Sequence, residues 1–185
     1  RATRLQANGN ILGGGPIDVA AWPDQERLPA VAACHTTDQY FVVWQSLQKS
    51  THYDIYGRFV EGDGALASVH HLALRPIHEV NPDIVSNPDA HHYLIVWQEQ
   101  YSNLSGPYGV SGRLIHTDAT TGDDFVIVAP YTGIERTEPA VAAGPPGYLV
   151  AWEHDRYGTS YTDIHGRLVW PAVVYLPLTL RNHMP

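Results

Sequence analysis

The chain has 185 residues, of which 44% are hydrophobic and 16% are charged, and its formal net charge is −8 at pH 7. This balance excludes a disordered chain, and the acidic charge without any basic block argues against nucleic acid as a partner. No apolar run reaches the ~20 residues of a membrane-spanning helix, so we expect no membrane insertion. The chain starts at Arg1 without a recognisable leader, and we interpret it as a processed product or a fragment.

One pattern occurs three times along the chain. Each copy opens with a proline and small apolar residues, at Pro29, Pro82 and Pro139. An aromatic residue and an apolar run then lead to a tryptophan, and a Gly-Arg pair follows. The recurring residues are Trp44, Trp97 and Trp152, which lie 53 and 55 residues apart, and Arg58, Arg113 and Arg167. A repeat of this length is typical of propellers, solenoids and other arrays.

The first 27 residues match only the second half of this pattern. Residues 3–6 align with residues 57–60, the turn 8–10 aligns with residues 62–64, and residues 16–21 take the place of a last strand. We therefore interpret residues 1–27 as a partial unit.

The first full copy predicts four short strands. Helical periodicity is missing, and proline and glycine separate runs of β-branched and aromatic residues. The expected strands are residues 30–34, 40–45, 54–60 and 68–74. Four antiparallel strands in about 50 residues, repeated along the chain, are typical of propeller blades.

We therefore predict an all-β fold of one domain, residues 1–185, built from propeller-type four-stranded antiparallel blades. It would contain about three and a half blades, namely the partial blade 1–27 and the blades 28–80, 81–137 and 138–185. One blade cannot bury both its faces alone, so neighbouring blades would share a core.

The combination of Tyr-x-Val-Val-Trp at residues 40–44, Asp-Ile-Tyr-Gly-Arg at residues 54–58 and Asp63-Gly64 resembles repeats of secreted bacterial β-propeller proteins. Residues 163–167 repeat the second motif closely, whereas residues 108–113 lack its aspartate. The C-terminal residues 174–182 also resemble a segment common in such proteins. The resemblance implies an extracellular or cell-surface protein with a propeller fold, and it implies no reaction.

Three and a half blades do not close a ring, because propellers have 4–8 blades. The unpaired strand edges could be completed by upstream sequence, by two chains sharing a seven-bladed ring, or by head-to-tail strand exchange in a polymer. The apolar C-terminal strand is either the outer strand of the last blade or a strand inserted into another subunit; a sorting signal is a third interpretation. The candidate assembly residues are Val173, Val174, Tyr175, Leu176, Leu178 and Leu180.

The repeated side chains have structural and functional interpretations. Trp44, Trp97 and Trp152 are expected to be core residues between blades, given their apolar flanks. Each of the three arginines is expected to stabilise its own blade; the alternative is that they form a shared anion site. Candidate partners are Glu26, Glu79, Glu135 and Glu138.

We expect no cofactor and no catalytic activity. The eleven histidines show no metal-ligand spacing. The acidic turns 61–63 and 122–124 lack the alternating oxygen ligands of a dedicated calcium loop, so calcium is the weaker interpretation. Nucleophile, phosphate-loop and Cys-x-x-Cys motifs are missing. A glycosidase pair stays open, because no two acids stand out.

The connections between the second and third strands of each unit are rich in tyrosine, serine and glycine, which suits a binding surface. The candidate ligand residues are Tyr53, Tyr101, Tyr108, Tyr157 and Tyr161; the other interpretation is that they are solvated loop aromatics without a ligand. Asn103 starts a glycosylation sequon in one of these loops.

The sequence thus predicts a non-enzymatic structural protein, secreted or at the cell surface, that forms a homo-oligomer or filament through unfinished blades and its C-terminal strand. The alternative is a propeller module that binds carbohydrate or protein through these loops. A third interpretation is an accessory region of a larger secreted hydrolase.

Overall fold

The computed structural model of the chain describes residues 1–3, 5–6, 8, 10, 15–23, 25–34, 36–47, 51–87, 91–101, 107–145, 147–156 and 161–170. These residues form eleven β-strands and contain no helix, so none of them provides a helix able to cross a lipid bilayer. The strands are β1 (Glu26–Cys34), β2 (Gln39–Ser46), β3 (Asp54–Glu61), β4 (Leu66–Ala73), β5 (His78–Asn87), β6 (His92–Gln100), β7 (Tyr108–His116), β8 (Phe125–Val128), β9 (Ile134–Gly144), β10 (Gly147–Arg156) and β11 (Thr162–Val169).

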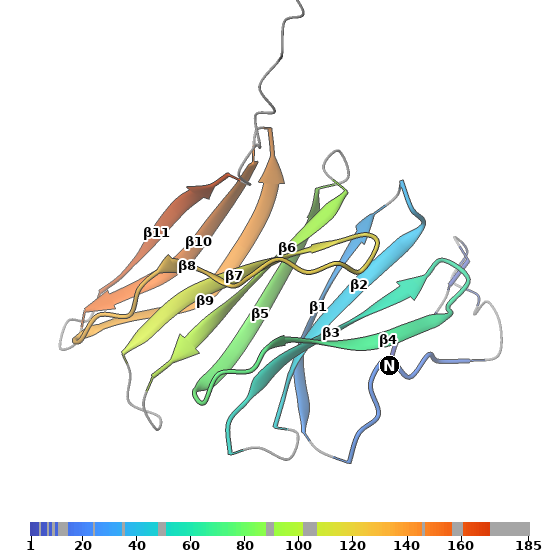
Figure 1. The fold of residues 1–185 in the computed structure, drawn as a ribbon, viewed down its shortest axis with the longest axis horizontal. Helices are drawn as coiled ribbons and strands as arrows, with labels where there is room; N and C mark the ends of the chain where they lie inside the picture. The colour runs from blue at the N-terminus through green and yellow to red at the C-terminus, as the bar shows by residue number, and fades with distance from the viewer. Residues whose placement is uncertain are drawn as a thin grey trace, which may run out of the picture.

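The strands form three antiparallel sheets that follow one another along the chain (Figure 1). The first sheet has the order β1-β2-β3-β4, the second β5-β6-β7-β8, and the third β11-β10-β9. Each strand pairs with its neighbours in sequence, which confirms the expected all-β fold and the four-stranded antiparallel unit in the first two copies. The fourth strand expected for the third copy, at residues 173–180, lies outside the described residues.

The first strand of each sheet contains a bulge before its proline, and β1 is longer than the expected residues 30–34. The pairing register shifts between Arg27 and Ala30, between Val80 and Asp83, and at the corresponding place in β9. The residue before each proline has a positive φ, namely Leu28 (49°), Asn81 (52°) and Glu138 (50°). Since proline has no N–H to donate, a bulge is where a strand tolerates it. Pairing continues on the N-terminal side of the bulge, so β1 begins at Glu26 rather than at residue 30.

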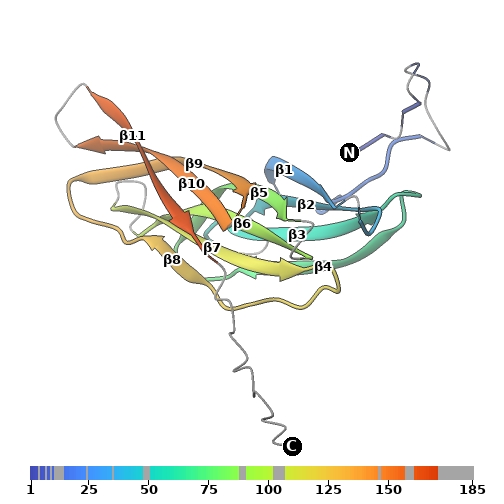
Figure 2. The same ribbon diagram turned by 90° about the horizontal axis from the view of Figure 1, so that it is seen from above.

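The second sheet lies between the other two, and its strand β6 is buried along its whole length (Figure 2). Because side chains alternate along a strand, Tyr93, Ile95 and Trp97 pack against the first sheet, whereas Leu94 and Val96 pack against the third. The core therefore consists of layers between sheets, each made by one face of two consecutive sheets.

A glycine permits this close packing in the first sheet. A Cβ on Gly57 would lie 2.5 Å from the nearest ring carbon of Phe41. The Phe41 ring lies 4.4 Å from that of Phe59 and 5.8 Å from that of Tyr93 in the second sheet. The glycine of the repeated Gly-Arg pair thus leaves room for an aromatic ring between the sheets.

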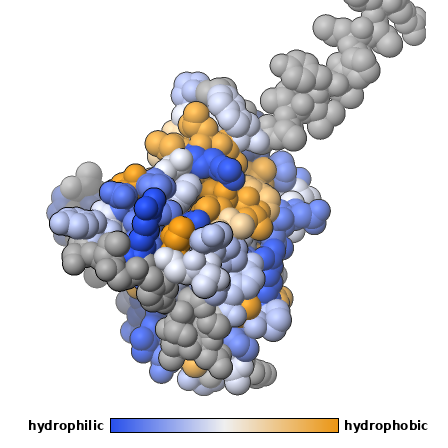
Figure 3. Space-filling view, turned by 90° about the vertical axis from the view of Figure 1, so that its left-hand side faces the viewer, coloured by the Kyte–Doolittle hydropathy of each residue, from blue (hydrophilic) through white to orange (hydrophobic). Residues whose placement is uncertain are grey.

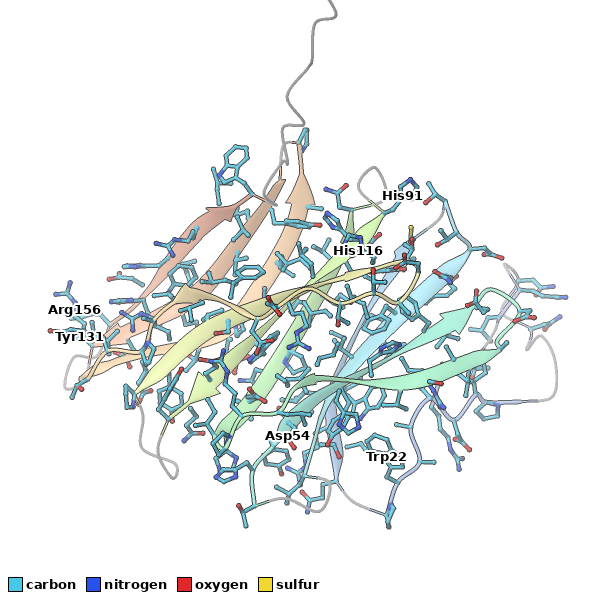
Figure 4. The ribbon with its side chains drawn as sticks, viewed as in Figure 1. Trp22, Asp54, His91, His116, Tyr131 and Arg156 are labelled. Atoms are coloured by element: carbon cyan, nitrogen blue, oxygen red, sulfur yellow. The ribbon has the colours of Figure 1, made fainter. Side chains whose placement is uncertain are left out.

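The N-terminal segment covers the outer part of the first sheet, on the side away from the second sheet. Ala2 and Ile17 form an antiparallel bridge, with hydrogen bonds of 2.8 and 2.5 Å. Trp22 packs with its ring centroid 5.1 Å from Tyr56 and 5.9 Å from Trp44 (Figure 4). The N-terminal segment therefore lies before the first sheet, while Glu26 and Arg27 pair within that sheet as part of β1.

Candidate functional site

The three repeated tryptophans all face the sheet or segment that precedes their own sheet. Trp44 packs with the N-terminal segment, Trp97 with the first sheet and Trp152 with the second. All three are almost fully buried. Their positions show that all three sheets have the same orientation in the stack. In each sheet the face that carries the tryptophan, which we call the backward face, points to the preceding part of the chain. The opposite face, which we call the forward face, points to the next sheet.

The forward face of the third sheet is uncovered in the described part of the chain. We call it the third-sheet face; its apolar part consists of Ala140 and Ala142 of β9, Leu149 and Ala151 of β10, and Ile164, Gly166 and Leu168 of β11, and the exposed Glu153, the register partner of Ile164, lies on the same face. Leu149 is 49% exposed and Leu168 is 58% exposed, whereas Leu94, which holds the place of Leu149 in the second sheet, is completely buried. Figure 3 views the side where β11 lies and shows apolar side chains gathered in its upper half.

The same repeat comparison reveals an uncovered region at the opposite end of the stack. Tyr40 of β2 is 45% exposed, whereas the equivalent Tyr93 and Tyr148 are buried. Val31 of β1 is 60% exposed, whereas the equivalent Ile84 is buried. The N-terminal segment covers β3 and the end of β2, and it leaves the inner strands of the first sheet open.

Two adjoining cavities, of about 390 and 500 Å³, occupy this uncovered region. Both are lined by Ala2, Val31 and Val42, so they form one groove, which we call the first-sheet groove. Its remaining walls are mainly apolar and include Trp44 and Val60. The groove lies where the inner strands of a preceding sheet would pack.

The repeated arginines bind backbone carbonyls or an aspartate, and none of their hydrogen bonds in the described region goes to the glutamates that the sequence suggested. Arg58 donates from Nε to the Ala67 carbonyl (2.6 Å) and from Nη1 to the Val19 carbonyl (2.8 Å). Arg167 donates to the Ile127 carbonyl of β8. Arg113 instead pairs with Asp124. Two of the three arginines thus tie their sheet to the segment that precedes it.

A carboxyl pair that the sequence did not single out lies between the first and second sheets. Glu79 and Glu99 are register partners on β5 and β6, and both side chains are completely buried. Glu99 accepts hydrogen bonds from Arg75 and from the Tyr101 hydroxyl, both of 2.8 Å. One oxygen of Glu79 has no hydrogen-bond donor among the described residues. Alternation along strands places these acids on the inner face, but nothing local in the sequence marks them as paired.

Burial raises the pKa of Glu79 to about 8, and the negative charges of Asp54 and Glu99 act in the same direction. Burial also raises the pKa of Asp54, whose place at the lower end of β3 is marked in Figure 4. A carboxyl with a raised pKa beside a second carboxyl is an arrangement that acid–base catalysis uses. Here both glutamates are sealed between two sheets, so a substrate has no access to them and the pair serves the sheet interface.

The candidate loop tyrosines are largely engaged within the protein. The hydroxyl of Tyr53 donates to Gln25 (3.2 Å), that of Tyr101 donates to the buried Glu99, and that of Tyr108 accepts from Gln100 (3.3 Å). Tyr161 is 81% exposed at the start of β11. Tyr157 and Asn103 lie outside the described residues, as do the assembly residues Val173, Val174, Tyr175, Leu176, Leu178 and Leu180.

Histidines meet in pairs rather than in metal-binding groups. His154 and His165 stack with ring centroids 4.0 Å apart, and His92 lies 2.5 Å from the Tyr148 hydroxyl. Burial lowers the pKa of His92 and of His154, and the neighbouring His116 and His165 respectively lower it further. Within the described ranges, no three histidine, cysteine or acidic side chains lie together as a metal site requires.

The three bulges line a shallow groove of about 420 Å³ on the inner strands, where β5 lies between β1 and β9. Asn81 donates from Nδ2 to Gln98 and to Glu138, both at 3.1 Å. Asp83 accepts from the Val141 N–H at 2.8 Å. The bonds to Glu138 and from Val141 link β5 to β9, so these polar groups of the groove hold the inner strands together.

No protein-family model matches the chain, and no curated protein is significantly similar to it.

Proposed function

We propose that the three sheets are blades of a propeller-type repeat protein, and that this protein is a non-enzymatic structural subunit, secreted or displayed at the cell surface, that self-assembles. Three features support the blade assignment. The strands of each sheet run in sequence order, consecutive sheets pack face to face, and the first strands β1, β5 and β9 lie side by side. These are features of a propeller, in which inner strands surround one axis.

The observation that carries the assembly proposal is the third-sheet face. Leu149 and Leu168 hold the positions of Leu94 and Leu114 in the second sheet, which pack against the next sheet. Flat apolar sheet faces of this kind favour association with a further layer. A second copy of the chain supplies such a layer, and a head-to-tail contact of this type generates rings or open filaments.

A charge on the third-sheet face tests the proposal. Leu168→Asp places a carboxylate in the contact, where it would lose its hydration, so we expect the native mass to fall to that of a single chain. Light scattering on a sizing column measures this mass across a range of concentrations.

The matched control is Leu74→Asp. Leu74 is 56% exposed and lies after β4, outside the third-sheet face, so this variant should keep the mass of the unmodified chain. An unmodified chain that stays a monomer at every concentration contradicts the proposal, as does an equal mass for Leu168→Asp and the unmodified chain.

A further inference from the structure

The shape and the apolar lining of the first-sheet groove suit it to bind a β-strand. In the second and third sheets, the residues equivalent to Val31 and Tyr40 are covered by strands of the preceding sheet. The N-terminal segment supplies only the outer part of such a cover, through Ala2, Ile17 and Trp22. What the groove lacks is therefore an inner strand with apolar side chains on one face.

The wall of the groove also offers backbone groups for pairing. Ala2 uses both its N–H and its carbonyl on Ile17. In an antiparallel pair the neighbouring residue then points its backbone groups to the opposite side. That residue is Thr3, which lines the groove, and its backbone groups have no hydrogen-bond partner within the described residues. A strand entering the groove can thus combine main-chain hydrogen bonds with apolar contacts, the usual basis of recognition by strand addition.

The chain carries a segment with the matching chemistry. Residues 173–180, Val-Val-Tyr-Leu-Pro-Leu-Thr-Leu, are apolar at most positions, and four of the eight are β-branched or aromatic. Pro177 lacks one backbone donor, which an edge or inserted strand tolerates.

This segment cannot lie along the groove of its own chain. Stacked sheets are about 10 Å apart, so the far side of the first sheet lies more than about 20 Å from the third sheet. Strand β11 of the third sheet ends at Val169 and the described part of the chain ends at Trp170; the three residues from Trp170 to Val173 extend at most about 11 Å.

We infer that the first-sheet groove binds residues 173–180 of a neighbouring copy of the chain as an added β-strand. The inference rests on the proposed self-assembly and names its donor and acceptor. The groove lies at the opposite end of the stack from the third-sheet face, so in a head-to-tail contact these two surfaces face each other, and the inference adds the tail strand to that contact.

The test measures binding of a fluorescent peptide of residues 171–185 to the full-length chain by anisotropy. The full-length chain carries Leu176→Asp and Leu178→Asp, so that the tails of neighbouring chains do not compete with the peptide. We expect saturable binding, and we expect Val31→Asp in this chain to weaken it at least tenfold, since a carboxylate would stand in the apolar groove. Val31 is 60% exposed on an edge strand, so its replacement should leave the fold intact.

Leu74→Asp in the same chain should bind the peptide unchanged, and a peptide carrying the two Leu→Asp changes should not bind. Absence of saturable binding overturns the inference, and so does binding that Val31→Asp leaves unaltered. If the peptide fails while Leu168→Asp still dissociates the assemblies, the assignment of the tail is wrong and the proposed function stands. If the peptide binds but the unmodified chain is always monomeric, the groove is correct and self-assembly is wrong.

Discussion

At the scale of single residues, the protonation state of the Glu79 carboxyl group affects the free energy of unfolding of this protein. It is completely buried between two sheets, opposite Glu99 and near Asp54, and its pKa is raised from 4.5 to about 8. At neutral pH the folded protein therefore binds a proton that the unfolded chain releases. The raised pKa of Glu79 therefore lowers the free energy of unfolding, and this destabilisation increases as the pH rises.

We predict that the free energy of unfolding falls as the pH rises from about 4.5 to about 8, with a contribution from Glu79 of up to ~1.4 kcal/mol per pH unit. Below this window both states hold the proton, and above it neither does. In Glu79→Gln this contribution is lost, so the advantage of the variant over the unmodified chain should increase with pH. Urea unfolding at pH 5, 6.5 and 8 measures the difference; Asp123→Asn, a change at an exposed carboxyl between β7 and β8, should show no such trend.

At the scale of single elements, the repeated bulge imposes a backbone conformation that its residues suit unequally. Leu28, Asn81 and Glu138 all have φ near +50°. Asparagine tolerates this left-handed region, whereas for leucine it costs roughly 1 kcal/mol. The first sheet therefore contains strain that the second sheet avoids.

Leu28→Asn should raise the free energy of unfolding by about 1 kcal/mol, because the left-handed conformation becomes easier to adopt. Leu28 is half exposed, so little packing is lost. Thermal or urea unfolding checks the change. The reverse substitution one repeat later, Asn81→Leu, should destabilise the protein, since it also removes the hydrogen bonds of Asn81 to Gln98 and Glu138. A less stable Leu28→Asn would contradict this account of the bulge.

The elements with local signals are the ones that the sequence predicts well. The second strands are apolar runs ending in tryptophan, and β2 and β3 lie within one residue of the expected 40–45 and 54–60. The first strands begin earlier than expected, because a bulge before Pro29 allows pairing to continue across the proline. No local pattern reports a positive φ at Leu28.

The sequence also misses the parts of the site that depend on contacts between sheets. Glu79 was a candidate partner of the repeated arginines, but it faces Glu99 and the backbone of Arg75. The arginines bind carbonyls such as those of Val19 and Ile127, which no residue type can signal. Leu149 and Leu168 occupy the same repeat positions as Leu94 and Leu114, so their exposure can be known only from the structure, in which no described sheet covers the third sheet.

At the scale of the whole molecule, stability should be graded along the stack. The second sheet has neighbours on both faces, and every residue of β6 is buried. Seven of the eight residues of β11 are exposed. Opening of β11 therefore exposes little new apolar surface, whereas opening of β6 separates all three sheets.

Amide hydrogen exchange followed by mass spectrometry should show slow exchange in peptides from β6 and much faster exchange in peptides from β11. If the third-sheet face is the assembly contact, raising the protein concentration should slow exchange in β11 and leave β6 unchanged. Leu168→Asp should abolish this concentration dependence. Equal exchange in the two strands would contradict the graded stack.

The backward direction of the tryptophans and of Arg58 and Arg167 has a consequence for synthesis of the chain. A ribosome releases the N-terminal segment first, then each sheet in turn. Each new sheet thus finds its docking surface already made, since Trp97 requires the first sheet and Arg167 requires β8. The chain can therefore fold one repeat at a time during synthesis, and each newly folded sheet is stabilised by its contacts with the preceding sheet.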